Sequence, residues 1–171
     1  MKKPKKPKPD SKINTDFSDI TLEGEEDCEV PVYDSCDETR RKINLFLSQS
    51  SMSKSQFARE ISKSFGTNTE KKVSPGSLTA FLAKSGPTAG NTSAVFYASY
   101  VFFEKMRIRD GEPKSEHREV MEEVWDGTDF NGPSYPGMDL KKLFERVEYI
   151  VPAHSEVEIY QDEYGKVQMG W

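Results

Sequence analysis

The stretch that decides the fold runs from Met52 to Gly86, MSKSQFAREISKSFGTNTEKKVSPGSLTAFLAKSG. Its first half predicts a helix that begins after Ser53, because Ser53 and Gln56 stand three residues apart and can satisfy each other's backbone N–H groups in a capping box. A helix in this frame gathers apolar side chains on one face and leaves polar and basic ones on the others. The apolar residues on that face are Phe57, Ala58 and Ile61.

The second half of the stretch repeats this pattern. Ser74 is the expected N-cap, and Pro75 follows at the first helical position, where the missing N–H of proline has no cost. The dipeptide Gly86-Pro87 ends the helix, since glycine favours the position after a helix and proline cannot continue it. The buried stripe of this helix is predicted to consist of Leu78, Phe81 and Leu82.

Two capped amphipathic helices this close in sequence must cross and share one small core, which is the arrangement of a helix-turn-helix. The residues that carry the two patterns resemble the helix-turn-helix of the phage-repressor, or Cro-like, class. The wider block from CDETRRKINLFL (36–47) to NTSAVFYASYVFFEKMRI (91–108) is similar to an uncharacterised helical domain of fungal proteins. The chain departs from the phage pattern between residues 61 and 73, where it is several residues longer than the tight turn of that class.

Charge is distributed unevenly along the 171 residues, whose formal net charge is -5. Residues 1–39 carry net -5, residues 40–109 carry net +9, and residues 110–171 carry net -9. A basic block that contains the helix-turn-helix and has acidic flanks favours an anionic partner such as DNA. The alternative is that this basic face meets the acidic tail of the same chain.

The resemblance also implies which residues would bind DNA. By analogy with repressor-like docking, the second helix would face the major groove, while helix N-termini and basic side chains would bind phosphates. The residues expected to contact DNA are Arg40, Arg41, Lys54, Gln56, Arg59, Lys71, Lys72, Ser74, Gly76, Ser77, Thr79 and Lys84. Of those facing the groove, Lys84 alone has a long polar side chain that discriminates bases. We therefore expect salt-sensitive binding with modest sequence preference, in a transcriptional or chromatin-associated regulator.

Further helices are predicted on both sides of the central stretch. Ser35 begins one of them, with Glu38 as its capping-box partner. The segment from Ser93 to Ile108 is apolar most of the way round, so it either forms the centre of the core or shares its outer face with another chain. The second interpretation makes the protein a dimerisation or protein-interaction module, in which the helix-turn-helix is only scaffold.

The C-terminal part predicts a smaller unit. A helix is expected over residues 115–125 and another from Asp139, and SEVEIYQDEYGKVQMGW alternates as a β-hairpin that offers a second surface for a partner. The predicted fold is mainly α, a compact bundle of four to five helices with a helix-turn-helix, plus a small C-terminal helix and β-hairpin. The predicted parts are a disordered tail (1–34), a helical domain (35–126), a linker (127–138) and the C-terminal unit (139–171).

The N-terminal run MKKPKKPKPD is either a nuclear-import signal or phosphate-binding arm, or a solubilising tail of a cytoplasmic protein. His117 and His154 lie in different segments without ligand spacing, and no phosphate-binding glycine loop occurs. We therefore expect no enzyme activity, metal, cofactor or small-molecule substrate. No apolar run reaches the roughly 18 residues of a membrane span, so we expect no membrane partner.

Overall fold

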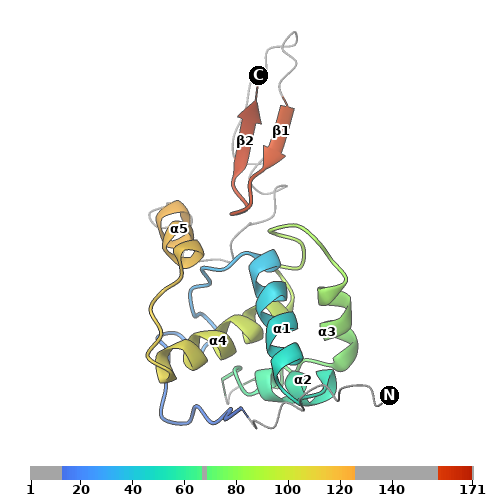
Figure 1. The fold of residues 1–171 in the computed structure, drawn as a ribbon, viewed down its shortest axis with the longest axis vertical. Coiled ribbons are helices and arrows are strands. Elements are labelled where there is room, and N and C mark those ends of the chain that lie inside the picture. The colour runs from blue at the N-terminus through green and yellow to red at the C-terminus, as the bar shows by residue number, and fades with distance from the viewer. Residues whose placement is uncertain (1–12, 67–68, 126–157, 171) are drawn as a thin grey trace, which may run out of the picture.

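In the part of the chain that the structure describes, five helices pack together, as predicted for a mainly α fold (Figure 1). The computed structural model describes residues 13–66, 69–125 and 158–170. Its helices are α1 (Cys36–Gln49), α2 (Lys54–Ser62), α3 (Pro75–Leu82), α4 (Ala94–Arg109) and α5 (Glu116–Trp125). The strands β1 (Glu158–Gln161) and β2 (Val167–Gly170) pair antiparallel, with Glu158 opposite Gly170.

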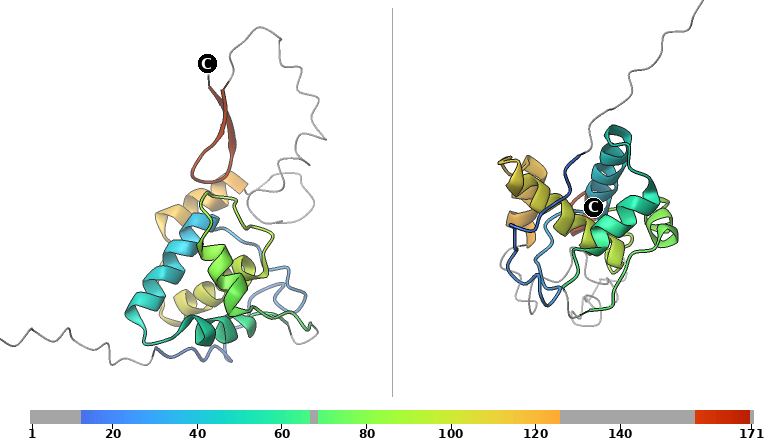
Figure 2. Two further views of the ribbon diagram at one scale, coloured as in Figure 1. Left: turned by 90° about the vertical axis from the view of Figure 1, so that its right-hand side faces the viewer. Right: turned by 90° about the horizontal axis from the view of Figure 1, so that it is seen from below.

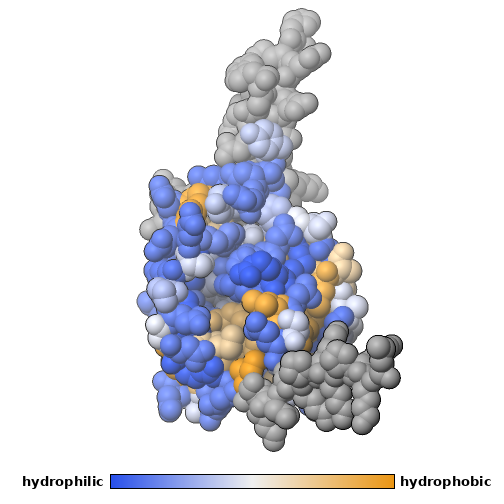
Figure 3. Space-filling model, viewed as in Figure 1, coloured by the Kyte–Doolittle hydropathy of each residue, from blue (hydrophilic) through white to orange (hydrophobic). Residues whose placement is uncertain are grey.

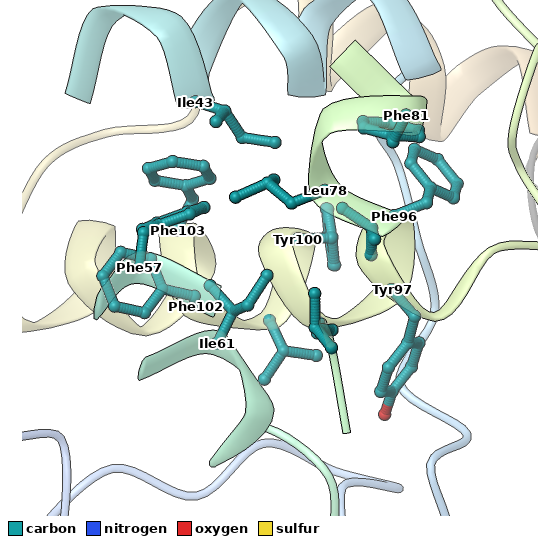
Figure 4. Close-up of a cluster of buried hydrophobic side chains, with 14 of the residues drawn as sticks. Ile43, Phe57, Ile61, Leu78, Phe81, Phe96, Tyr97, Tyr100, Phe102 and Phe103 are labelled. Carbon is teal, nitrogen blue, oxygen red and sulfur yellow. The ribbon is translucent and has the colours of Figure 1, made fainter. Parts of the chain in front are cut away.

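The core is centred on α4, which contacts α1, α2 and α3. Every residue of α4 from Val95 to Phe103 is buried, which confirms that this apolar helix is a core element. Its residue Phe102 meets Phe57 of α2 edge-to-face, with ring centroids 5.4 Å apart (Figure 4), and meets Phe46 of α1 at the same distance. Residues 95–103 therefore offer no outer face to a second chain.

Serine side chains begin the helices as predicted. Ser53 and Gln56 form the reciprocal capping box of α2, and Ser74 caps α3 with Pro75 at its first turn. At α1 the expected box is only half formed. The Ser35 hydroxyl accepts a hydrogen bond from the Glu38 N–H, but the Ser35 N–H donates to Nε2 of His117 at 3.3 Å. A histidine of α5 thus replaces the glutamate that local spacing predicted.

Residues 13–34 correct the expectation of a disordered tail over residues 1–34. Val30 and Val32 are buried in the core, and Phe17 packs edge-to-face on Phe102 with ring centroids 5.2 Å apart. An ion pair between Glu25 and Lys105 fastens the same segment to α4. The segment, dark blue in Figure 2, is a packed part of the domain, and residues 1–12 lie outside the described residues.

Helix α5 is joined to the bundle through polar contacts and one apolar residue. Arg118 contacts Tyr100 and Glu104 of α4, and Met121 is fully buried. The β1–β2 pair contacts the loop between α3 and α4, where Thr88 Oγ1 donates to Gln161 Oε1 at 3.1 Å. The linker expected over 127–138 and the helix expected from residue 139 lie outside the described residues. None of the helices in the described ranges is long and apolar enough to cross a membrane.

Candidate nucleic-acid interface

Helix α3 buries one side and leaves the other uncovered. Leu78 and Phe81 are 0% and 2% exposed and point into the core (Figure 4), where Phe81 lies 6.2 Å from Phe96 between ring centroids. Figure 2 (left) looks onto the opposite side of α3. The exposed residues of α3 and its flanks are Ser74, Pro75, Gly76, Ser77, Thr79, Ala80, Ala83 and Lys84. A second molecule can therefore approach this helix directly.

Buried residues hold both ends of the loop before α3 in place. Phe65 is buried and stacks on Tyr97 with ring centroids 6.1 Å apart, shortly after α2 ends. Just before α3, Val73 is buried and its N–H donates to Ser62 Oγ of α2 at 2.9 Å. These anchors hold α3 against α2 although the connection is longer than a tight turn. Lys71 and Lys72 are left exposed directly before α3.

The N-terminus of α3 is made of small polar groups. Ser74 Oγ accepts from the Ser77 N–H, and Ser77 Oγ accepts from the Ser74 N–H, both at 3.1 Å. This reciprocal pair was not predicted, because glutamate or glutamine is the usual partner at that position. Pro75 has no N–H, and the Gly76 N–H finds no acceptor within the described part of the chain. One helix-terminal donor thus faces outward beside compact side chains.

The cations on α2 and beside α3, with the exception of Lys63, differ from most others in the described part of the chain. Across all the described residues, nine arginine and lysine side chains form ion pairs with carboxylates. The exposed cations that form none are Lys54, Arg59, Lys71, Lys72 and Lys84. Lys166, partly exposed and next to β2, is also unpaired. An exposed cation without a carboxylate keeps its full attraction for an external anion.

Arg40 does not belong to this set, which corrects the expectation that it contacts DNA. Its side chain is buried, donates to the carbonyls of Gly86 and Ala89, and pairs with Asp37 at 2.8 Å. The guanidinium also lies 5.0 Å from the centroid of the Phe81 ring. Because its donors are already used within the fold, the Arg40 side chain cannot reach a phosphate. Arg40 is a structural residue, a clamp that joins α1 to the loop after α3.

Arg41 and Gln56, two further predicted contacts, are exposed but already have partners. Arg41 donates twice to Glu38, at 2.6 and 2.8 Å. Burial raises the pKa of Glu38, but the hydrogen bonds and charge of Arg41 outweigh it and hold that pKa below its usual range. Gln56 accepts the Ser53 N–H through Oε1. Binding of DNA by Arg41 would require it to leave Glu38 or to share its charge.

The face of the molecule that contains α1 and α3 is mostly polar. Figure 3 shows a mainly hydrophilic face, with hydrophobic surface gathered over the region of α1 and α3. Leu45 of α1, 46% exposed, is one of the large hydrophobic residues at the described surface. Within the described residues no group of three or more His, Cys, Asp or Glu side chains is placed to hold a metal ion.

Comparison with known proteins adds one finding. Residues 30–113 match a family model described as a domain of unknown function, DUF7726. That range contains α1 to α4 and every residue of the candidate interface. No curated protein and no solved structure gives a significant match to this chain. The match therefore covers the part of the chain that carries the candidate interface.

Proposed function

We propose that this protein binds DNA through α3, with α2 and α3 acting as a helix-turn-helix of the repressor-like kind. The observation that carries the proposal is that exposed cations without an ion-pair partner lie on α2 and shortly before and after α3, whose outer side is uncovered. These cations are Lys54, Arg59, Lys71, Lys72 and Lys84. Phosphate contacts of this kind supply most of the affinity of non-specific DNA binding.

The proposed contacts divide between phosphates and bases. Lysines before and after α3, together with the Gly76 N–H, bind the backbone and set the position of the helix. The outward residues Gly76, Thr79 and Ala80 are small, so the helix can enter the major groove closely. They offer few hydrogen bonds to base edges, and sequence preference is therefore modest. The Lys/Pro run at the N-terminus supports a nuclear location for such a regulator.

The test is the affinity for a short DNA duplex at about 50 and 200 mM salt, measured by fluorescence anisotropy. Changing Lys71→Ala together with Lys72→Ala removes two phosphate contacts and lowers the slope of log affinity against log salt by about two. The matched control changes Lys114→Ala and Lys166→Ala, which alters net charge equally away from α3. No binding at low salt, or equal losses in both double variants, would overturn the proposal.

A further inference from the structure

Ser74 has a sequence neighbour that DNA binding does not use. Proline follows it, and Ser74-Pro75 is the single Ser-Pro or Thr-Pro dipeptide in the sequence. Lys71 and Lys72 come shortly before it. A serine followed by proline is the dipeptide that proline-directed serine/threonine kinases recognise, because their substrate cleft accepts a residue without an N–H directly after the target.

The structure leaves this dipeptide accessible. Ser74 and Pro75 are both exposed, and Ser74 has extended backbone angles, φ -87° and ψ 155°. The residues from Thr69 to Ser74 belong to no helix or strand, so no element of secondary structure has to open before Ser74. Val73 has to leave its buried position and its hydrogen bond to Ser62 Oγ when a kinase binds this segment. On the C-terminal side of Ser74, the first turn of α3 has to open, and Gly76 within that turn makes its opening easier.

We propose that Ser74 is phosphorylated by a proline-directed kinase and that the phosphate switches off DNA binding by α3, an inference that rests on the proposed function. In the transfer, Ser74 Oγ forms a bond to the γ-phosphorus of ATP and the bond from that phosphorus to the β,γ-bridging oxygen breaks. ADP leaves with the electron pair, and the hydroxyl proton passes to a carboxylate of the kinase.

The phosphate acts at the point where DNA phosphate would bind. A phosphoserine adds up to two negative charges beside the Gly76 N–H and near Lys71 and Lys72, which removes the local positive field. The same charge is favourable at a helix N-terminus, so α3 stays folded. The modified protein thus loses affinity by charge competition, while its fold is kept.

The first arm of the test measures phosphate transfer and needs no DNA. The purified full-length chain is incubated with ATP and a cyclin-dependent kinase, and the modified residue is mapped by mass spectrometry. We expect phosphate on Ser74 and at least a tenfold lower initial rate in Ser74→Ala and Pro75→Ala, with Ser53→Ala, a helix cap without a following proline, unaffected. No transfer, or transfer to other residues alone, overturns the inference even if DNA binding is established.

The second arm compares DNA affinity before and after modification. Phosphorylated protein is expected to bind a duplex at least tenfold more weakly at low salt than untreated protein. Ser74→Ala, whose own affinity is measured first because Ser74 caps α3, is expected to bind equally before and after kinase treatment. Ser74→Asp should give a smaller loss, and Ser115→Asp, an equal charge at the start of α5, should give none. Unchanged affinity of the phosphorylated protein overturns the switch. Absence of binding by unmodified protein overturns the proposed function and the switch, and leaves Ser74 labelling as a separate result.

Discussion

Arg40 joins segments that are far apart in sequence. Its guanidinium reaches from α1 to the carbonyls of Gly86 and Ala89 in the loop between α3 and α4, and it covers the ring of Phe81. The planar fork of arginine suits several acceptors at once, which the single ammonium of lysine does not. One buried cation therefore joins α1 to the loop that follows α3, beside the candidate interface.

Arg40→Lys is expected to lower the free energy of unfolding by about 1–3 kcal/mol, because at least one partly buried carbonyl loses its donor. Urea unfolding at neutral pH measures the change. Arg41→Lys serves as control, since Arg41 is 61% exposed and should alter stability by no more than about 0.5 kcal/mol. Equal effects at the two positions would show that Arg40 is not a clamp. The salt slope of DNA binding should stay unchanged in Arg40→Lys, in contrast to the lysine variants.

At the scale of elements, α3 is the shortest of the described helices and depends on its caps and on two core residues. Eight residues are too few for a stable isolated helix in water, so packing of Leu78 and Phe81 must supply most of its stability. Gly76 in its first turn weakens it further, since glycine loses more backbone freedom on folding than other residues. The helix proposed to meet DNA is therefore also an element that opens easily.

Gly76→Ala is expected to raise the free energy of unfolding by about 0.4–1 kcal/mol, because alanine restricts the unfolded chain. The added Cβ would meet only Ser74 Oγ, at 3.8 Å. Gly90→Ala is the matched contrast and should destabilise, since Gly90 has φ +98° and its added Cβ would lie 2.8 Å from Phe81 Cδ2. Thermal unfolding of both variants measures the pair. A loss of stability in Gly76→Ala would contradict the account of α3.

At the scale of the whole molecule, long-range polar contacts hold the peripheral segments to the bundle. Arg118 of α5 lies 4.9 Å from the centroid of the Tyr33 ring and hydrogen-bonds to Tyr100 of α4. Burial raises the pKa of Tyr100, so its hydroxyl stays protonated at neutral pH. Glu104 completes this group by pairing with Arg118 at 3.3 Å and with Arg107 at 2.8 Å. These contacts hold α5 against α4.

This group makes stability depend on pH in the acid range. Burial raises the pKa of Glu104, but hydrogen bonds from Arg107 and the charge of Arg118 outweigh it, so the folded pKa lies below the ordinary value. The unfolded state therefore binds the proton more readily. The contribution of Glu104 to stability is present above its ordinary pKa of about 4.3 and is lost as pH falls through the folded pKa.

Glu104→Gln is expected to lower the free energy of unfolding at pH 7 by about 1–3 kcal/mol, since Arg118 and Arg107 lose a charged acceptor. The difference from the unchanged protein should shrink as pH falls below about 4.3. Glu104 is then protonated first in the unfolded state and, at lower pH, in the folded state as well. Urea unfolding at a series of pH values measures this. Glu112→Gln, an exposed carboxylate next to the same helix, is the control. A difference that is constant with pH would contradict the assignment.

The sequence by itself determined the helices and their starting points. Ser53 and Ser74 cap residues three positions away, and apolar side chains three and four positions apart share a face, so these features depend on neighbours within one helical turn. For the same reason the buried residues of α2, Leu78 and Phe81 of α3, and the exposed outer side of α3 were predictable. Leu82, predicted in the same buried stripe, is only half-buried. The capping pair of Ser74 with Ser77 is equally local, but serine is an uncommon partner there.

Only the tertiary structure decided which of the predicted cations are free. Arg40 and Lys54 look alike in the sequence, yet the fold buries Arg40 against two carbonyls and leaves Lys54 exposed and unpaired. It also packed residues 13–34 onto α4 and brought His117 to the Ser35 N–H. Each of these outcomes depends on which groups approach within a few ångströms across tens of residues of chain, and that distance is set by core packing rather than by any local pattern.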